Sequence, residues 1–184
     1  MTDLNKLAQE LHEAAVAKGF WDVEDAEIKH IAKMHSELSE AIQEDRCGRP
    51  MLYVDDIEVM DRITDPAMFD GRKPEGVAAE LADFVMMMLD LCAKEEYRFP
   101  SGNPHEWLLY SECNDDALRV CGLWTLVCAL HAEMCELVYN PNVAPKAICM
   151  VSEWLRVHGV DLLEIIRLKM EYNRSRPKLH GRLY

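Results

Sequence analysis

One segment, residues 77–92 (VAAELADFVMMMLDLC), constrains the fold more than any other part of this chain. Drawn as a helix, it is apolar around almost its whole circumference, and such a helix is buried among other helices. Yet Glu80 and Asp83 lie within it, three residues apart on one face, and Asp90 falls on nearly the same line. Burying a carboxylate is unfavourable by several kcal/mol unless a cation or a metal ion compensates its charge. The segment therefore predicts a buried helix whose acids need cations.

Helical spacing of apolar residues continues through most of the chain, and Gly and Pro cluster between the helical segments. The pattern predicts helices at 3–18, 25–46, 74–96, 115–138, 146–157 and 160–173. Only 51–60 shows any strand-like alternation, so the predicted class is all-α, a helical bundle. Residues 47–74 contain three Pro and two Gly, and a connection of this length is either a functional lid or partly disordered.

Charge and composition argue against several classes of protein. The chain has 33 Asp and Glu against 20 Lys and Arg, a net charge of −13, which repels phosphate backbones and argues against binding to nucleic acid polymers. No apolar run approaches the ~20 residues that span a membrane, and the first residues lack the basic and apolar regions of a secretory signal. The seven Cys contain no CxxC pair and are typical of reduced thiols. We therefore expect a soluble cytoplasmic protein without membrane contacts.

A second acid pair, Glu37 and Glu40, lies on the predicted helix 25–46 and has the same i, i+3 spacing. If the two helices pack together, the two pairs place four carboxylates around one pocket. Such hard oxygen ligands suit Mg²⁺ or Mn²⁺ and do not suit zinc, which prefers His and Cys. Taken alone, Glu37 and Glu40 also fit a solvated helix face, but the buried pair Glu80 and Asp83 requires a neutralising partner.

The order of these acids, Glu37-x-x-Glu40 followed by Glu80-x-x-Asp83, resembles the metal signature of the MazG-like, all-α nucleoside triphosphate pyrophosphohydrolases. The tail GVDLLEIIRLKMEYNRSRPKLHG (159–181) is similar to the closing helix of that family and its K-x-x-x-N-x-x-R ending. The motif KGFW, before the first acidic helix, also fits the phage-type and small bacterial members.

This resemblance implies that the protein hydrolyses a (deoxy)nucleoside triphosphate to the monophosphate and pyrophosphate, as a nucleotide-pool house-cleaning enzyme. It implies a homodimer or homotetramer whose cofactor is Mg²⁺, with Mn²⁺ as a substitute. The four acids would hold the metal ion, which lowers the pKa of a bound water, and Glu37 or Glu40 would accept the proton of that water. Substrate contacts would come from Lys169, Asn173 and Arg176 at the departing pyrophosphate, and from Trp21 and Lys18 at the base or sugar.

The resemblance covers about residues 1–92 and 159–184, and the chain departs from the family in three respects. Ser36 stands where the family often has a further Glu, so an additional ligand or base is missing. The gap between the two acid pairs is longer than usual, which predicts an enlarged lid. Residues 94–158 form an insertion, and we predict that 1–184 is a single helical domain that includes it.

The insertion contains an echo of the first acidic helix. HAEMCEL (131–137) shares its His and both Glu with HSELSEA (35–41). The echo is either chance or a degenerate repeat that replaces the packing surface of a partner subunit. Glu153 and Arg156 stand where a second ExxD motif would be needed, so we expect no second working metal site.

Several assignments have a plainer alternative. Trp21 also fits a core position at a helix end, and Lys169 and Asn173 also fit a solvated chain terminus. His35 and His131 lie on helix faces dominated by apolar residues, where packing is the simpler role.

Three other interpretations compete with the pyrophosphohydrolase. A ferritin-like di-iron bundle needs two Glu-x-x-His motifs, and this chain has one, Glu27 to His30. A histidine-aspartate phosphohydrolase needs an adjacent His-Asp pair, and the sequence contains none. A catalytically decayed MazG-like binding or regulatory protein stays open, although retention of all four acids argues against it.

Overall fold

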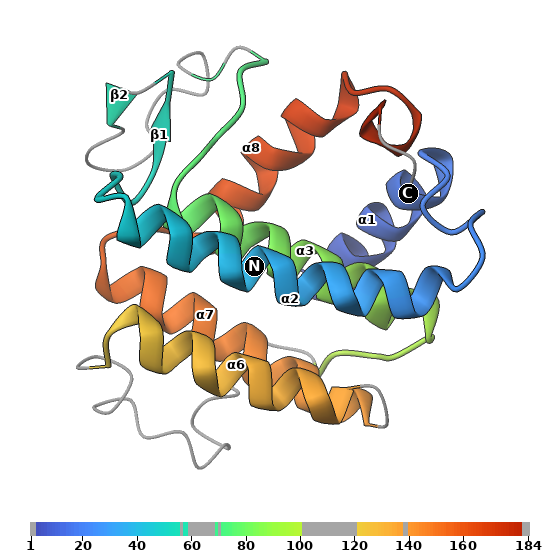
Figure 1. Cartoon of the computed structure of the whole chain (residues 1–184). Coiled ribbons are helices and arrows are strands. Elements are labelled where there is room, and N and C mark those ends of the chain that lie inside the picture. The colour runs from blue at the N-terminus through green and yellow to red at the C-terminus, as the bar shows by residue number, and fades with distance from the viewer. Residues whose placement is uncertain are drawn as a thin grey trace.

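A computed structural model of the chain describes residues 3–55, 57–58, 69, 71–100, 121–137 and 140–181. In these residues the fold is all-α, as predicted, with six α-helices and one hairpin of two very short strands (Figure 1). The helices are α1 (Leu4–Ala17), α2 (Ala26–Arg46), α3 (Val77–Lys94), α6 (Leu123–Leu137), α7 (Ala144–Val157) and α8 (Leu162–Arg174).

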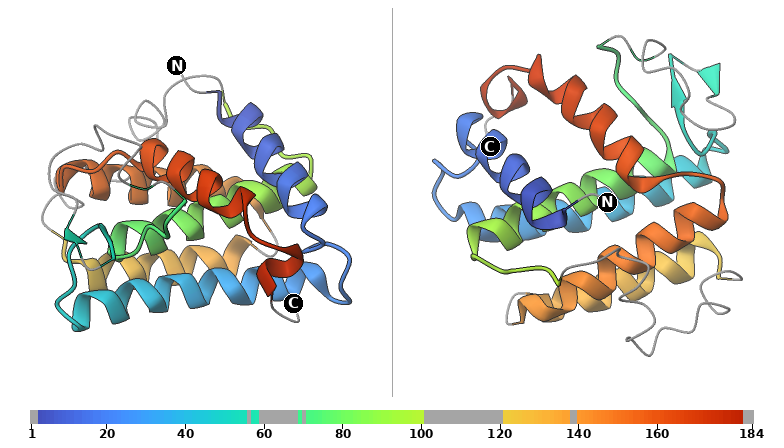
Figure 2. Two further views of the ribbon diagram at one scale, coloured as in Figure 1. Left: turned by 90° about the horizontal axis from the view of Figure 1, so that it is seen from above. Right: turned by 180° about the vertical axis from the view of Figure 1, so that it is seen from behind.

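Helix α3 lies in the middle of the bundle and packs against α1, α2, α7 and α8 (Figures 1 and 2). Fourteen of its residues are buried, including Glu80 and Asp90, so the predicted buried helix is confirmed. Asp83, predicted to be buried with Glu80, is only half-buried, because it borders the cleft. Its side chains Phe84, Met88 and Leu89 are fully buried because neighbouring helices cover it on several sides. The central position of α3 brings its acids within reach of side chains from several other elements.

Helices α6 and α7, which belong to the predicted insertion, lie side by side on one side of α2 and α3 (Figure 1). Helices α1 and α8 lie on the other side. Buried apolar residues from all six helices form one continuous cluster, which includes Leu130 and Met134 of α6 and Ile148 of α7. The α6–α7 pair therefore shares its core with the helices that carry the acids.

Local chemistry sets several helix ends. Asp3 caps α1 and Asp161 caps α8, each accepting hydrogen bonds from backbone N–H groups of the first turn, at 3.0 Å from Asn5 and 2.8 Å from Leu163. Helix α3 begins at Val77, three residues later than predicted, because Gly76 precedes it with a φ of 104°. Helix α6 occupies only the second part of the predicted helix 115–138, and positions 115–120 lie outside the described residues.

The connection from α2 to α3 contains the hairpin, in which β1 (Tyr53–Val54) pairs antiparallel with β2 (Ile57–Glu58). Tyr53 also exchanges two backbone hydrogen bonds with Glu75, at 2.9 and 3.0 Å, which tie the hairpin to the residues just before α3. Positions 56, 59–68 and 70 lie outside the described residues, so the prediction that this connection is a lid or partly disordered lies there too.

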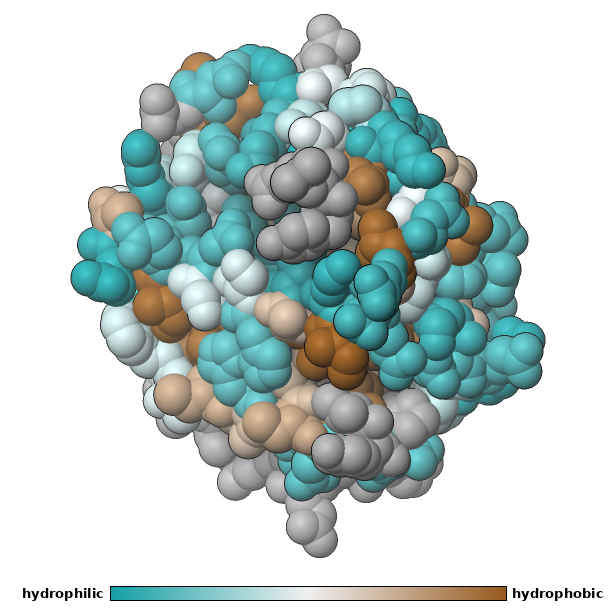
Figure 3. All heavy atoms as spheres, turned by 45° about the vertical axis from the view of Figure 1, so that its right-hand side comes forward, coloured by the Kyte–Doolittle hydropathy of each residue, from teal (hydrophilic) through white to brown (hydrophobic). Residues whose placement is uncertain are grey.

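Among the described residues, few large apolar side chains are exposed: Val16, Ile28, Ile57, Trp124 and Val157. On the face shown in Figure 3, hydrophobic residues are scattered among hydrophilic ones. Isolated exposed apolar residues of this kind are ordinary for a folded chain. No described helix combines the length and the apolar character needed to cross a membrane.

Candidate metal centre

Three acids from two helices form a compact carboxylate group. Glu37 and Glu40 of α2 and Glu80 of α3 each offer an oxygen atom, and these three atoms all lie within 4.8 Å of one another. The i, i+3 spacing places Glu37 and Glu40 on one face of α2, which packs along α3. Glu37 and Glu80 are buried, with 5% and 6% of their surface exposed, whereas Glu40 is exposed.

Asp83, the fourth predicted ligand, has a different partner. Its Oδ2 lies 2.6 Å from Nζ of Lys169, a lysine of α8 that is only 2% exposed. Lys169 also lies 3.5 Å from the carbonyl oxygen of Pro74. The structure thus brings three of the four predicted acids within coordinating distance of one another and pairs the fourth with a buried lysine.

The pKa values of Glu80 and Glu37 are raised, so these carboxyl groups ionise less readily than free ones. Burial raises the pKa of Glu80 to about 8; Lys169 lowers it, while Asp83 and Glu37 raise it. Burial also raises the pKa of Glu37, and the charge of Asp83 adds to that effect. A divalent cation would favour the ionised forms, because an opposite charge stabilises a carboxylate. This set of oxygen donors therefore fits a hard ion such as Mg²⁺ or Mn²⁺.

A cleft of about 1110 Å³ runs beside this cluster, between α1, α2, α3 and α8. Its lining includes Glu37, Glu40 and Asp83, and it also contains many cationic side chains: Lys18, Lys29, Lys33, Lys73, Lys169, Arg174 and Arg176. Acids that suit a metal ion and cations that suit an anion thus share one cavity. The lining has seven Lys and Arg against six Asp and Glu, so the cleft is close to neutral in a chain with a net charge of −13.

The residues predicted to bind pyrophosphate, Lys169, Asn173 and Arg176, all line the cleft. Arg176 donates from Nη1 to Oδ1 of Asn173 at 3.4 Å. Positive charge is dense around this point. Burial lowers the pKa of the nearby His180 to about 4, and the charges of Arg176 and Lys33 lower it further.

Lys18 lies in the cleft wall but is engaged with the main chain. Its Nζ donates to the carbonyl oxygens of Arg174, at 3.1 Å, and of Arg176. These carbonyls lie at the C-terminal end of α8, where a cation interacts favourably with the exposed oxygens. Backbone N–H of Leu179 donates in turn to the carbonyl of Lys18 at 2.8 Å. Lys18 therefore holds the end of α8 against the end of α1.

Trp21 is not among the described residues that line the cleft, whereas its neighbour Phe20 is. The Trp21 ring stacks on the ring of His30, with centroids 4.9 Å apart, and its Nε1 donates to Oδ1 of Asp90 at 3.1 Å. The assignment of Trp21 to the base or sugar stays a prediction, and in this structure its contacts are with the cleft wall. Phe20 lies within the quoted motif KGFW, but sequence analysis did not single it out.

Sequence analysis also missed a polar group around Asp90. Nδ1 of His12 lies 2.7 Å from Oδ1 of Asp90, and Nε2 of His30 lies 2.8 Å from the carbonyl oxygen of Met87. Burial raises the pKa of Asp90 to about 6 and lowers that of His30 to about 4. The position of Asp90 on the line of acids was visible in the sequence, but no local signal identified the two histidines.

The two similar segments, 35–41 and 131–137, are in contact through their histidines. Nδ1 of His35 on α2 lies 2.7 Å from Nδ1 of His131 on α6, and the two rings are within 8° of parallel. The second set of acids is paired with cations of the protein: Glu133 lies 2.5 Å from Nζ of Lys146, and Glu153 accepts from Nε of Arg156 at 2.8 Å. The prediction of a degenerate repeat fits this arrangement and stays a prediction.

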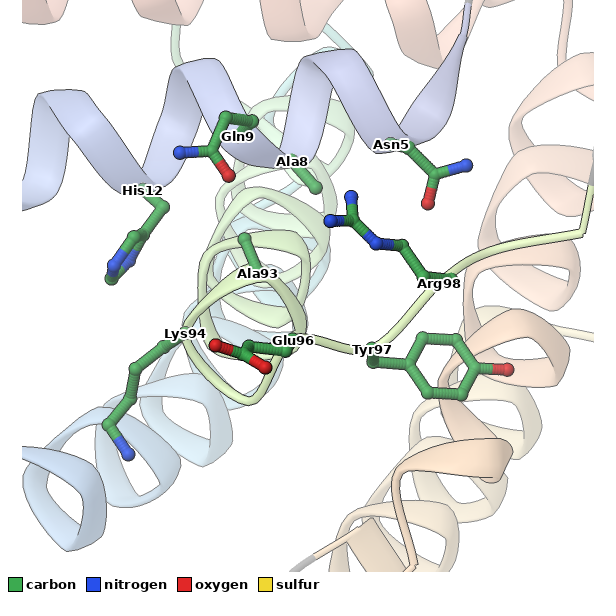
Figure 4. A pocket seen from close by; sticks show the side chains of 9 residues that line it. All are labelled: Asn5, Ala8, Gln9, His12, Ala93, Lys94, Glu96, Tyr97 and Arg98. Carbon is green, nitrogen blue, oxygen red and sulfur yellow. The ribbon is translucent and has the colours of Figure 1, made fainter.

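A second, smaller pocket of about 410 Å³ lies between α1 and the end of α3 (Figure 4). Its lining mixes charges of both signs, from Lys94, Glu96 and Arg98. Asn5 closes one side by exchanging two hydrogen bonds with the backbone of Phe99, at 3.0 and 2.8 Å. It contains no group of carboxylates, so the larger cleft is the better candidate for a metal centre.

Comparisons of this chain with protein-family models, with curated proteins and with solved structures find no match.

Proposed function

We propose that this protein is a Mg²⁺-dependent, MazG-like pyrophosphohydrolase that converts a (deoxy)nucleoside triphosphate to the monophosphate and pyrophosphate. The observation that carries the proposal is the group formed by Glu37, Glu40 and Glu80 at the wall of a cleft that is also rich in lysine and arginine. A triphosphate with a divalent ion needs both kinds of group, oxygen ligands for the ion and donors for the phosphate oxygens.

Glu37, Glu40 and Glu80 would hold the divalent ion, and Asp83 is the fourth ligand that the sequence predicts. When bound, such an ion neutralises phosphate charge and makes water a better nucleophile. Glu40 is the exposed member, and Ser36 donates to its Oε1 at 3.0 Å, which orients the carboxylate. Glu37 or Glu40 would accept a proton from the attacking water.

Cations in the same cleft, two of which also pair with its acids, would bind the phosphates. A triphosphate carries about four negative charges at neutral pH, and a chain of −13 repels it within a Debye length of about 8 Å unless local cations intervene. Lys33, Lys169 and Arg176 line the cleft and supply these cations. Donors that are already in place as the pyrophosphate departs stabilise the charge that develops on it.

One observation favours a second candidate, a catalytically decayed protein that binds a nucleotide without hydrolysing it. Lys169 already neutralises Asp83 at 2.6 Å, and a protein cation at this point performs part of the task of a metal ion. In the active enzyme the same lysine stays beside the phosphates. Only turnover distinguishes the two candidates.

The test is a panel of nucleoside and deoxynucleoside triphosphates incubated with Mg²⁺ in ¹⁸O-labelled water. Attack at the α-phosphorus places the label in the nucleoside monophosphate and releases pyrophosphate, and this is the expected result. Release of orthophosphate as the first product would refute the assignment. Glu80→Gln protein, purified in the same way, is the control for contaminating phosphatases. Binding of nucleotide with no turnover of any member of the panel would favour the decayed protein.

A further inference from the structure

The cleft lining contains a further carboxylate, Asp90, which lies away from the group formed by Glu37, Glu40 and Glu80. We call the part of the cleft beside Asp90 its far end. Asp83 and Asp90 lie seven residues apart on α3, a rise of about 10 Å along the helix, and both line the cleft. On α2 the same displacement separates Glu37 of the metal group from His30 at the far end. This span is comparable with the distance from the phosphates to the base in an extended nucleotide.

The two oxygens of Asp90 have unequal partners. Oδ1 lies 2.7 Å from Nδ1 of His12 and accepts from Nε1 of Trp21 at 3.1 Å. Oδ2 has, among the described residues, only Nε2 of His30 at 3.5 Å, and that nitrogen is 2.8 Å from the carbonyl of Met87. Asp90 is 4% exposed, and a buried acceptor without a hydrogen bond calls for a partner. Oδ2 is therefore the oxygen left for a ligand.

The surroundings of Asp90 suit a flat, weakly polar ligand. His30 and Met87 line the cleft beside Asp90, and the His30 ring is one on which a base can stack. His30 stacks on Trp21, which fixes the orientation of its ring. The wall beside Asp90 thus offers one ring, His30, together with one acceptor oxygen.

We propose that Asp90 selects the base of the nucleotide by accepting a hydrogen bond from its exocyclic amino group, so that cytosine and adenine are preferred over uracil and hypoxanthine. An ionised carboxylate accepts hydrogen bonds and donates none. It pairs with the amino group of cytosine, whereas the carbonyl oxygen at the same position of uracil repels it. This inference rests on the proposed function, because it assumes that the phosphates lie at the Glu37 end.

Two matched pairs of substrates test the proposal, dCTP against dUTP and dATP against dITP. The members of each pair differ in an amino group or a carbonyl oxygen at one ring carbon, and in whether the adjacent ring nitrogen carries a hydrogen. At about pH 8, above the pKa of Asp90 of about 6, we expect kcat/KM to favour the amino member of both pairs by about tenfold. A ratio near one in both pairs overturns the proposal, whatever the absolute rates.

The variant Asp90→Asn tests whether the Asp90 carboxylate itself sets the preference. His12 and Trp21 hold an acceptor at the Oδ1 position, so the new amide places its NH₂ group where Oδ2 was. A donor there favours the carbonyl of uracil, and we expect the preference for dCTP over dUTP to fall to one or to reverse. Asp45→Asn is the matched control, because Asp45 also accepts from a tryptophan, Trp124, but lies outside the cleft. It should keep the preference of the wild type.

Binding of dCMP and dUMP, measured by calorimetry with wild type and Asp90→Asn, gives a result that does not depend on turnover. Tighter binding of dCMP to wild type, lost in Asp90→Asn, supports the inference. If triphosphates are hydrolysed but Asp90→Asn leaves both preferences unchanged, the role of Asp90 is wrong and the proposed function stands. If no triphosphate is hydrolysed and neither monophosphate binds, the proposed function fails, and the base selection fails with it.

Discussion

The ammonium of Lys169 lies 2.6 Å from the carboxylate of Asp83, and both side chains line the cleft beside Glu37 and Glu40. Lysine and aspartate come from α8 and α3, so this ion pair joins the closing helix to the central one. Lys169 also lowers the pKa of Glu80 and Glu37, and Lys33, which lies 3.4 Å from Glu37, lowers the pKa of that acid as well. Lys169 and Lys33 are thus internal counter-ions of the carboxylate group.

Lys169→Met should destabilise the protein by about 1–3 kcal/mol at neutral pH, because it leaves Asp83 without its cation beside other acids. The figure is below that for a fully buried pair because the Asp83 side chain is 25% exposed. Urea unfolding followed by circular dichroism measures the change. The double variant Lys169→Met/Asp83→Asn should recover most of the loss, since it removes both charges. Equal stability of Lys169→Met and wild type would show that the pair is not important for folding.

Lys169→Met and Arg176→Met should also change kinetics, each lowering kcat as well as raising KM on the best triphosphate. That pattern indicates groups that act on the charge of the departing pyrophosphate, whereas a loss of ground-state binding alone leaves kcat unchanged. Lys6→Met is the control, because Lys6 is exposed on α1 and its partner is Glu10, at 3.7 Å. Unchanged kcat and unchanged KM in both variants would place the phosphate site elsewhere.

Glu80→Gln should raise the thermal stability of the metal-free protein at pH 8. The pKa of Glu80 is about 8 in the folded chain against an ordinary 4.5, so the unfolded chain ionises first as pH rises. Stability is therefore lost between about pH 4.5 and 8 in the wild type, and Gln removes this loss. Each kcal/mol recovered should raise Tm by about 2–4 °C in calorimetry with a chelator present. A lower Tm for Glu80→Gln at pH 8 would contradict the raised pKa.

Added Mg²⁺ should stabilise the wild type more at pH 8 than at pH 6, because the ion binds the ionised carboxylates. In Glu80→Gln the shift in Tm should be small at both values, and turnover should fall at least about 100-fold. Ca²⁺ serves as a comparison, since it takes the same oxygen ligands at longer distances. If the Tm of the wild type does not change with Mg²⁺ at any pH, the acids have only a structural role.

Acid should loosen the contact between α6 and α2. Burial, together with the charge of His35, lowers the pKa of His131 from its ordinary 6.5. As pH falls below about 6.5, the unfolded form takes up a proton before the folded form does, so stability decreases. Hydrogen exchange in α6 should therefore accelerate more between pH 7 and 5, after correction for intrinsic rates, in wild type than in His131→Gln. Identical pH dependence in the two proteins would exclude this pair as the cause.

The sequence by itself predicted the helical class, the buried central helix and the acid pairs on two helices. These features are local, because helical periodicity, apolar content and i, i+3 spacing depend only on neighbouring residues. Glu37, Glu40 and Glu80 indeed lie within coordinating distance of one another. The predicted helix 115–138 runs through Gly122, whereas α6 begins after this residue. A single glycine is a weak guide to a helix boundary.

Only the tertiary structure decided which partners these residues have. Lys169 neutralises Asp83 from 86 positions away along the chain, and His12 approaches Asp90 from 78 positions away. No periodicity relates such pairs, since helix packing and not sequence distance brings their side chains together. The same packing sets how far each acid is removed from water, and burial is the largest cause of the raised pKa values of Glu80 and Asp90. Residue types and local spacing were therefore set by the sequence, whereas pairing, burial and the cleft between the helices arise when the helices pack.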